Sequence, residues 1–166
     1  MNILRTGLAR LAIAPVGLPP SWSAVPLRLI AGCGFLEHGL AKLGRGPEHF
    51  IAILAAIGVP HPALLGWATV AVEIVGGAMI LCGMLVPLAS IPMAAILGVA
   101  IGTVHWAYGF SSIKLMSFDA AGAHFGQPGY ETDLLYLACL LALCIGGAGP
   151  VSIDAHLARR RSRALK

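Results

Sequence analysis

Long apolar stretches alternate with shorter polar segments along the whole chain. Four of these stretches have about the length that a helix needs to cross the hydrocarbon core of a bilayer, roughly 20 residues. They run from about 24 to 43, 64 to 84, 88 to 106 and 130 to 147. This pattern predicts an all-α integral membrane protein whose four spanning helices form a bundle.

Two shorter segments show a one-sided apolar pattern and are predicted to lie at the membrane surface. Residues 47–57 are bounded by Gly46 and Gly58, with a proline at the start, as is typical of a short helix. Its apolar side chains share one face, so we expect an interfacial helix between the first and second spans. The leucines in residues 1–14 also fall on one helical face and predict a second interfacial segment.

The predicted elements divide the chain into three regions: an N-terminal interfacial segment (1–22), a four-helix transmembrane domain (23–155) and a basic tail (156–166). The turn at 84–87 is short and makes the second and third spans antiparallel neighbours. The connection at 107–129 is long for a compact bundle. We expect it to fold over the outer mouth of the bundle rather than to form a fifth span.

Composition and charge support a membrane protein. Of the 166 residues, 58% are hydrophobic and 11% charged, whereas soluble domains carry about 25% charged residues. The net charge of +4 comes largely from the tail, so we do not expect nucleic-acid binding. The five basic tail residues are Arg159, Arg160, Arg161, Arg163 and Lys166. Since basic flanks stay in the cytoplasm, this tail, together with Arg5 and Arg10 near the other end, predicts that both termini are cytoplasmic.

Ionisable residues inside the predicted spans are the candidate functional residues. Each costs about 2.5–3.5 kcal/mol to insert, so a chain that keeps several buries them against one another. Glu73 lies near the middle of the second span, and its candidate partners on the first span are Arg28, His38 and Lys42. Such a pair either fixes helix register or handles protons and binds a ligand. Arg28 and Lys42 lie near opposite ends of their span and can also extend to the headgroups.

The cysteines and histidines argue against two other kinds of site. No two of the four cysteines have the C-x-x-C spacing of a dithiol redox centre. No two of the six histidines are three or four residues apart, so no metal site is predicted.

Several short motifs, in their order and spacing, resemble the DoxX family of small four-span membrane proteins. The matching stretches are residues 27–30, 37–43, 58–60, 73–77 with Gly83, 129–131, 134–137 and 149–154. Together they cover most of residues 25–155. The resemblance implies a four-helix bundle in a bacterial plasma membrane and an association with redox chemistry, because members resemble subunits of a thiosulfate:quinone oxidoreductase. Related four-span dithiol enzymes use a cysteine pair, which this chain lacks.

The leading hypothesis is therefore a redox-linked membrane protein that binds a quinone between its helices. A quinone needs an apolar slot with a few polar groups that bond its carbonyls and move protons. Glu73 and His38 are the predicted catalytic residues. The residues predicted to line the quinone site are Arg28, Glu37, Lys42, His105, Glu131 and Tyr136. The sequence supplies no electron donor, so a partner or a soluble substrate is required.

Two other functions stay open. The protein is alternatively a non-catalytic subunit that anchors or assembles a larger membrane complex, in which case the charges are helix-locking pairs. A small transporter is less favoured, since the chain has no internal repeat for alternating access. The lipid bilayer is the expected partner, and both a homo-oligomer and a larger complex are compatible with the sequence.

Overall fold

The computed structural model describes residues 17–164, which are mostly helical. In chain order the elements are η1 (Pro20–Ser23), α2 (Ala24–Gly44), α3 (Pro47–Ala56), α4 (Pro62–Ala71), η2 (Val72–Gly76), α5 (Gly77–Cys82), α6 (Val86–Ala100), η3 (Ile101–His105), η4 (Trp106–Tyr108), β1 (Leu115–Asp119), β2 (Gly122–Phe125), α7 (Glu131–Gly146) and α8 (Ile153–Ala164). The interfacial segment predicted at residues 1–14 lies outside the described residues.

Each of the four long apolar stretches is helical. Two continuous helices, Pro62–Cys82 and Val86–Tyr108, are long and apolar enough to cross a membrane. Each contains one π-helical segment, η2 in the first and η3 in the second. Helix α2 has 21 residues but carries several ionisable side chains. Helix α7 has 16 residues, or about 24 Å at 1.5 Å per residue.

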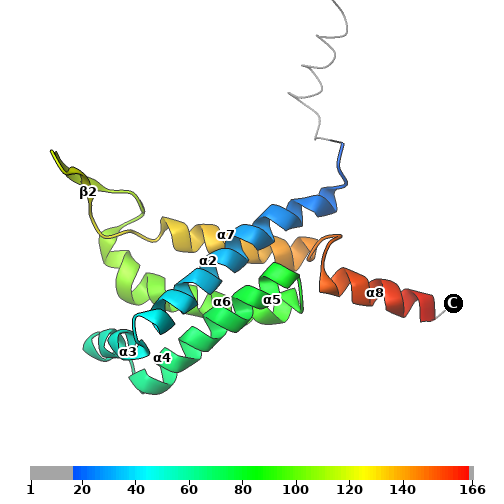
Figure 1. Ribbon diagram of the computed structural model, residues 1–166, viewed down its shortest axis with the longest axis horizontal. Coiled ribbons are helices and arrows are strands. Elements are labelled where there is room, and N and C mark those ends of the chain that lie inside the picture. The colour runs from blue at the N-terminus through cyan, green and yellow to red at the C-terminus, as the bar shows by residue number, and fades with distance from the viewer. Residues whose placement is uncertain (1–16, 165–166) are drawn as a thin grey trace, which may run out of the picture.

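The four long helical segments pack around a common core. Helix α2 contacts α5 and η2, and it also contacts α7, which in turn packs on α6. Figure 1 shows α3 and the two strands at one end of this arrangement and α8 at the other. The core side chains are apolar and come from all four segments; they include Phe35, Ile80, Met93, Leu140 and Leu143.

Glycines let α2 and α5 approach until their backbones touch. A Cβ at Gly77 would lie 2.7 Å from the backbone nitrogen of Leu36 and 2.9 Å from the carbonyl oxygen of Gly32. Small residues that permit such contact are typical of helix packing in membranes, where dispersion rather than the hydrophobic effect holds helices together. The Gly32–Gly77 crossing fixes how the next turns of the two helices meet.

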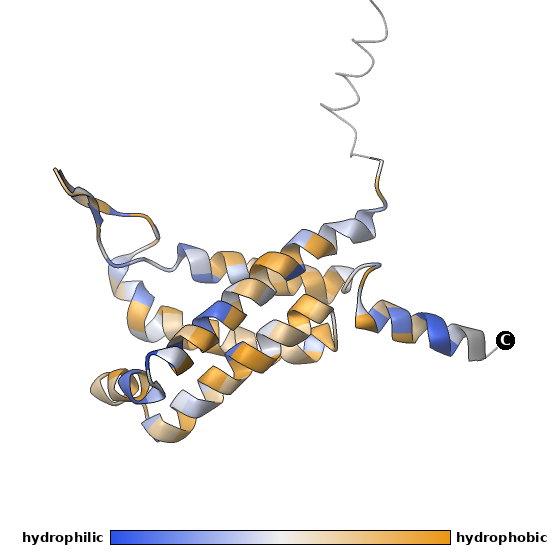
Figure 2. Ribbon diagram, viewed as in Figure 1, coloured by the Kyte–Doolittle hydropathy of each residue, from blue (hydrophilic) through white to orange (hydrophobic). Residues whose placement is uncertain are grey.

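Apolar residues make up most of the long helices, as the largely orange ribbon in Figure 2 shows, and many of them are exposed on the outer surface. Many large apolar side chains on it are more than half exposed, among them Leu64, Leu88, Ile91, Leu135 and Ile145. A water-soluble protein rarely exposes so large a contiguous apolar surface. This surface fits a lipid environment.

The connection between the third and fourth helical segments corrects the all-α prediction. Strands β1 and β2 pair antiparallel, with Phe118 opposite Ala123. Asp119 Oδ1 accepts the N–H of Ala121 at 2.8 Å, and Gly122 takes a φ of +119°, which favours glycine. The predicted lid is also wrong: the strands are exposed and project away from the helices in Figure 1. No fifth span forms here, as predicted.

The short helix predicted at residues 47–57 is confirmed as α3, which packs on α4. Gly46 has a φ of +91° and Pro47 occupies the first turn, so the chain reverses direction there. At the other end, α8 begins at Ile153 and carries Arg159, Arg160, Arg161 and Arg163.

Candidate functional site

Lys42 and Glu73 form a buried ion pair between α2 and η2. The Lys42 Nζ lies 2.5 Å from Oε1 and 2.6 Å from Oε2 of Glu73. The Glu73 side chain is 6% exposed and that of Lys42 22%. Lys42 Nζ also lies 4.9 Å from the centroid of the Phe50 ring on α3, a distance at which a cation is attracted to a ring face.

Local structure brings the two side chains together. Gly39 of α2 faces η2, since a Cβ there would lie 3.0 Å from the Glu73 Cβ. Lys42 lies about 60° around the helix from Gly39, at 100° per residue, and its long chain reaches Glu73. Glu73 itself lies in the π-helical segment η2, where the extra residue per turn changes side-chain directions. π-Helical segments often occur at functional sites.

The prediction that Glu73 contacts a basic residue of the first span is confirmed, and Lys42 is that residue. His38 lies about 100° around α2 from Gly39, is exposed, and makes no hydrogen bond with Glu73. Glu37 points about 180° away from the centre of the buried face and is also exposed. The structure therefore does not bring His38 or Glu37 to the ion pair.

Arg28 belongs to a different cluster, at the opposite end of α2. Its Nη1 donates to the carbonyl oxygens of Ala148 and Val151, both at 2.7 Å, and Nη2 donates to that of Leu81 at 2.9 Å. Only 7% of the residue is exposed. Arg28 thus neither extends to the headgroups nor pairs with Glu73. It bonds the last turn of α5 and the connection between α7 and α8, and it ties both to α2.

The same end is held by a second set of contacts. Asp154 accepts the backbone N–H groups of Leu85 at 2.9 Å and Val86 at 3.3 Å, at the start of α6. The Asp154 N–H donates to the carbonyl of Gly83 at 3.0 Å. Gly83 and Asp154, which belong to the family-like motifs of the sequence, both hold this junction.

A second polar contact joins His105, at the end of η3, to Asp133, in the first turn of α7. His105 Nδ1 lies 2.5 Å from Asp133 Oδ2, and the side chains are 27% and 9% exposed. The sequence analysis predicted His105 and missed Asp133. An acidic residue at the start of an apolar helix is the sequence signal that could have identified Asp133. Only the fold shows that its partner is His105.

The other two predicted residues lie at or near the start of α7. Glu131 Oε2 accepts the backbone N–H of Ser112 at 2.9 Å, which fastens the base of the loop that carries the hairpin. Tyr136 packs edge-to-face on Phe35 of α2, with ring centroids 5.6 Å apart. No contact joins either residue to Glu73 within the described part of the chain.

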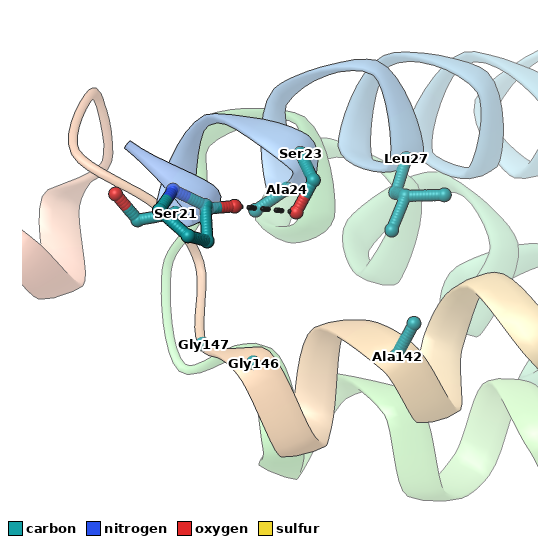
Figure 3. A pocket seen from close by; sticks show the side chains of 8 residues that line it. Ser21, Ser23, Ala24, Leu27, Ala142, Gly146 and Gly147 are labelled. Carbon is teal, nitrogen blue, oxygen red and sulfur yellow. Dashed lines mark hydrogen bonds between the residues drawn. The ribbon is translucent and has the colours of Figure 1, made fainter. Parts of the chain in front are cut away.

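A cleft of about 310 Å³ lies between the start of α2 and the end of α7. Figure 3 shows its lining of small residues, which includes Ser21, Ser23, Ala24 and Gly147. Because α2 rises about 1.5 Å per residue, this cleft is about 27 Å along the helix from Lys42. It is therefore separate from the Lys42–Glu73 pair.

Neither a metal cluster nor a disulfide is found within residues 17–164. No three side chains of His, Cys, Asp or Glu come together there as a metal ion would require. All four cysteines, Cys33, Cys82, Cys139 and Cys144, are free thiols.

Comparison with known proteins identifies the family. The sequence model of the DoxX family matches residues 23–106, which run from the residue before α2 to the first residue of η4. No curated protein and no solved structure matches the chain. The match covers half of the chain and contains Arg28, Lys42, Glu73 and His105. The family and the two apolar helices together indicate a membrane protein. The chain belongs to the DoxX family.

Proposed function

We propose that this protein crosses the bacterial plasma membrane four times, with both termini in the cytoplasm. We further propose that it binds a quinone beside the Lys42–Glu73 pair in a redox-linked process. The observation that carries this proposal is the burial of that pair in an otherwise apolar region. A buried charge in a membrane helix marks a ligand or proton pathway by default.

The two cationic side chains of α2, Arg28 and Lys42, have partners within the protein, as a spanning helix requires. The two terminal nitrogens of Arg28 donate to three carbonyl oxygens and Lys42 pairs with Glu73, so neither side chain faces lipid unpaired. The exposed side of the helix carries large apolar side chains, including Leu29, Ile30 and Leu40. Helix α7 is short, and a 24 Å helix is accommodated by local thinning of the bilayer.

The chemistry of the pair suits a quinone headgroup. The ammonium of Lys42 is a donor for a quinone carbonyl oxygen, and the Glu73 carboxylate can accept a proton from a reduced hydroxyl. Gly39 and the Phe50 ring lie beside the pair. Electrons come from a partner or a soluble substrate, because no redox-active group of the described residues lies at the pair.

The test is quinone binding by purified protein in nanodiscs. Glu73→Gln keeps the volume and removes the charge, and it should weaken binding by about tenfold or more, the cost of a lost charge-assisted hydrogen bond. Glu48→Gln is the matched control, because Glu48 is exposed in the first turn of α3. Unchanged binding in a folded Glu73→Gln protein would rule out the pair as the quinone site.

One observation favours the second candidate, a subunit of a larger membrane complex. Glu37 points away from the rest of the protein and is exposed on α2, about 10 Å before the end of that helix. A carboxylate at such a position is costly unless another chain pairs it. Cross-linking through Cys33, which is exposed one turn before Glu37, tests for a neighbouring subunit.

A further inference from the structure

The His105–Asp133 pair leaves one atom free to bind a ligand. Asp133 Oδ2 lies 2.5 Å from His105 Nδ1, whereas Nε2 has no hydrogen-bond partner within residues 17–164. A carboxylate that accepts the Nδ1–H fixes the tautomer in which Nε2 carries a lone pair. The ring is 27% exposed, so Nε2 is accessible, while Asp133 is held inside at 9%.

This pair is not needed to close the loop that lies between its two residues. Three backbone hydrogen bonds already join the loop's ends, from Gly129 to Ser111, Tyr130 to Gly109 and Glu131 to Phe110, at 2.9 to 3.1 Å. In addition, the Glu131 carboxylate accepts the backbone N–H of Ser112. Thr132 donates its backbone N–H and its hydroxyl to the Ser112 hydroxyl oxygen. A buried carboxylate and a partly exposed imidazole therefore occupy a junction that other hydrogen bonds already hold.

A group of aromatic rings lies at the same junction of η3, η4 and α7. Trp106 directly follows His105 and stacks on Tyr130, with centroids 5.3 Å apart and planes at 15°. Phe110 packs edge-to-face on Tyr130, with centroids 5.8 Å apart. The exposed face of such a stack suits another flat ring.

We propose that His105 Nε2 accepts a hydrogen bond from the hydroxyl of a hydroquinone headgroup whose ring packs against Trp106, and that Asp133 is the positioning residue. This inference rests on the proposed quinone function and adds a second site, selective for the reduced form. The selectivity follows from donor and acceptor chemistry: a hydroquinone has hydroxyl donors, whereas a quinone offers carbonyl acceptors alone.

The experiment compares the binding of both forms. Trp22 and Trp67 are replaced by Phe so that Trp106 fluorescence reports on the site, and the protein in nanodiscs is titrated with a short-chain hydroquinone and its quinone. We expect the hydroquinone to bind about tenfold more tightly at Trp106, as one additional hydrogen bond allows.

Two variants separate binding from a structural role. Asp133→Asn can donate its amide hydrogen to Nδ1, which moves the imidazole proton to Nε2 and should abolish or reverse the preference. His105→Gln should remove the preference for the reduced form. His124→Gln is the control, because His124 pairs with Asp119 on the exposed hairpin. This variant should leave the affinities for both forms, and so the preference for the reduced form, unchanged. If the two site variants instead lower the melting temperature and leave the preference intact, the pair is structural and the inference is overturned.

The outcomes also separate this inference from the function on which it rests. Binding that depends on Glu73 but shows no preference at Trp106 would overturn the hydroquinone site and leave the quinone function standing. A wild-type protein that binds neither form would overturn both. A preference for the quinone in the wild type would show that Nε2 donates, which contradicts the proposed tautomer.

Discussion

Replacing Arg28 should destabilise the protein more than replacing any other cation on α2. Its guanidinium donates to three carbonyl oxygens, on Leu81, Ala148 and Val151, and so joins three helices. Arg28→Met keeps much of the apolar stem but removes all three donors. The carbonyl groups in the last turn of α5 and in the connection between α7 and α8 then lose their partner.

The size of the effect follows from the burial of each bond. The bond to Ala148 is buried and the other two are partly buried. A lost hydrogen bond from a charged donor costs about 1.5–3 kcal/mol when buried, and water replaces part of it when it is not. We therefore expect Arg28→Met to lower the free energy of unfolding by about 3–5 kcal/mol.

Arg28→Lys provides the graded test. An ammonium keeps the charge but lacks the planar fork that reaches carbonyl groups in different directions. We expect it to cost about 2 kcal/mol, between wild type and Arg28→Met. The measurement is unfolding in detergent or bicelles. Arg45→Met serves as the control, because Arg45 is exposed at the end of α2 and should change stability by less than about 1 kcal/mol.

The reasoning would be refuted by an Arg28→Met protein as stable as the Arg45→Met control. That result would mean that water or lipid satisfies the three carbonyl groups as well as the guanidinium does. If Arg28→Met does not accumulate in the membrane, Arg28→Lys still tests the reasoning. An Arg28→Lys protein with the wild-type free energy of unfolding would show that the number of hydrogen bonds does not matter.

Three further predictions concern other parts of the chain. Gly77→Ala should cost about 2 kcal/mol or more in unfolding experiments, because its Cβ would meet backbone atoms of α2, whereas Gly98→Ala, with nothing within 4 Å, should be neutral. Phe118→Ser should change stability by less than about 0.5 kcal/mol, since the residue is 78% exposed; a melting-temperature drop as large as that of Gly77→Ala would show that the hairpin packs on the helices. Reporter fusions after residue 166 should be cytoplasmic, as the basic tail requires, and a periplasmic signal would reverse the topology.

Much of the helical arrangement could be predicted because its causes are local. An apolar stretch of about 20 residues determines a helix through its own hydrophobicity, and prolines and glycines mark its ends. The predicted 64–84 is observed as Pro62–Cys82, and the predicted 47–57 as Pro47–Ala56. The cost of a lone charge likewise implied that Glu73 would have a basic partner.

The hairpin was missed because β-pairing depends on two segments meeting, and neither segment is strongly patterned by itself. Residues 115–119 and 122–125 are short and mix apolar and polar side chains. The signals that close the turn, Asp119 and Gly122, are weak in isolation. Long-range hydrogen bonds between residues 109–112 and 129–132 then fix the position of the base of the hairpin.

The partners of the charged residues were decided by the tertiary structure alone. By sequence, Arg28, His38 and Lys42 were all candidates for Glu73, and His38 was the one predicted to act with it. The contact at Gly39 sets the rotation of α2 against η2, which turns Lys42 toward Glu73 and leaves His38 exposed. Asp133 is 28 residues from His105, and no local pattern joins them. Hydrophobicity is a property of each segment, whereas the pairing of charges depends on helix rotation and depth, which packing determines.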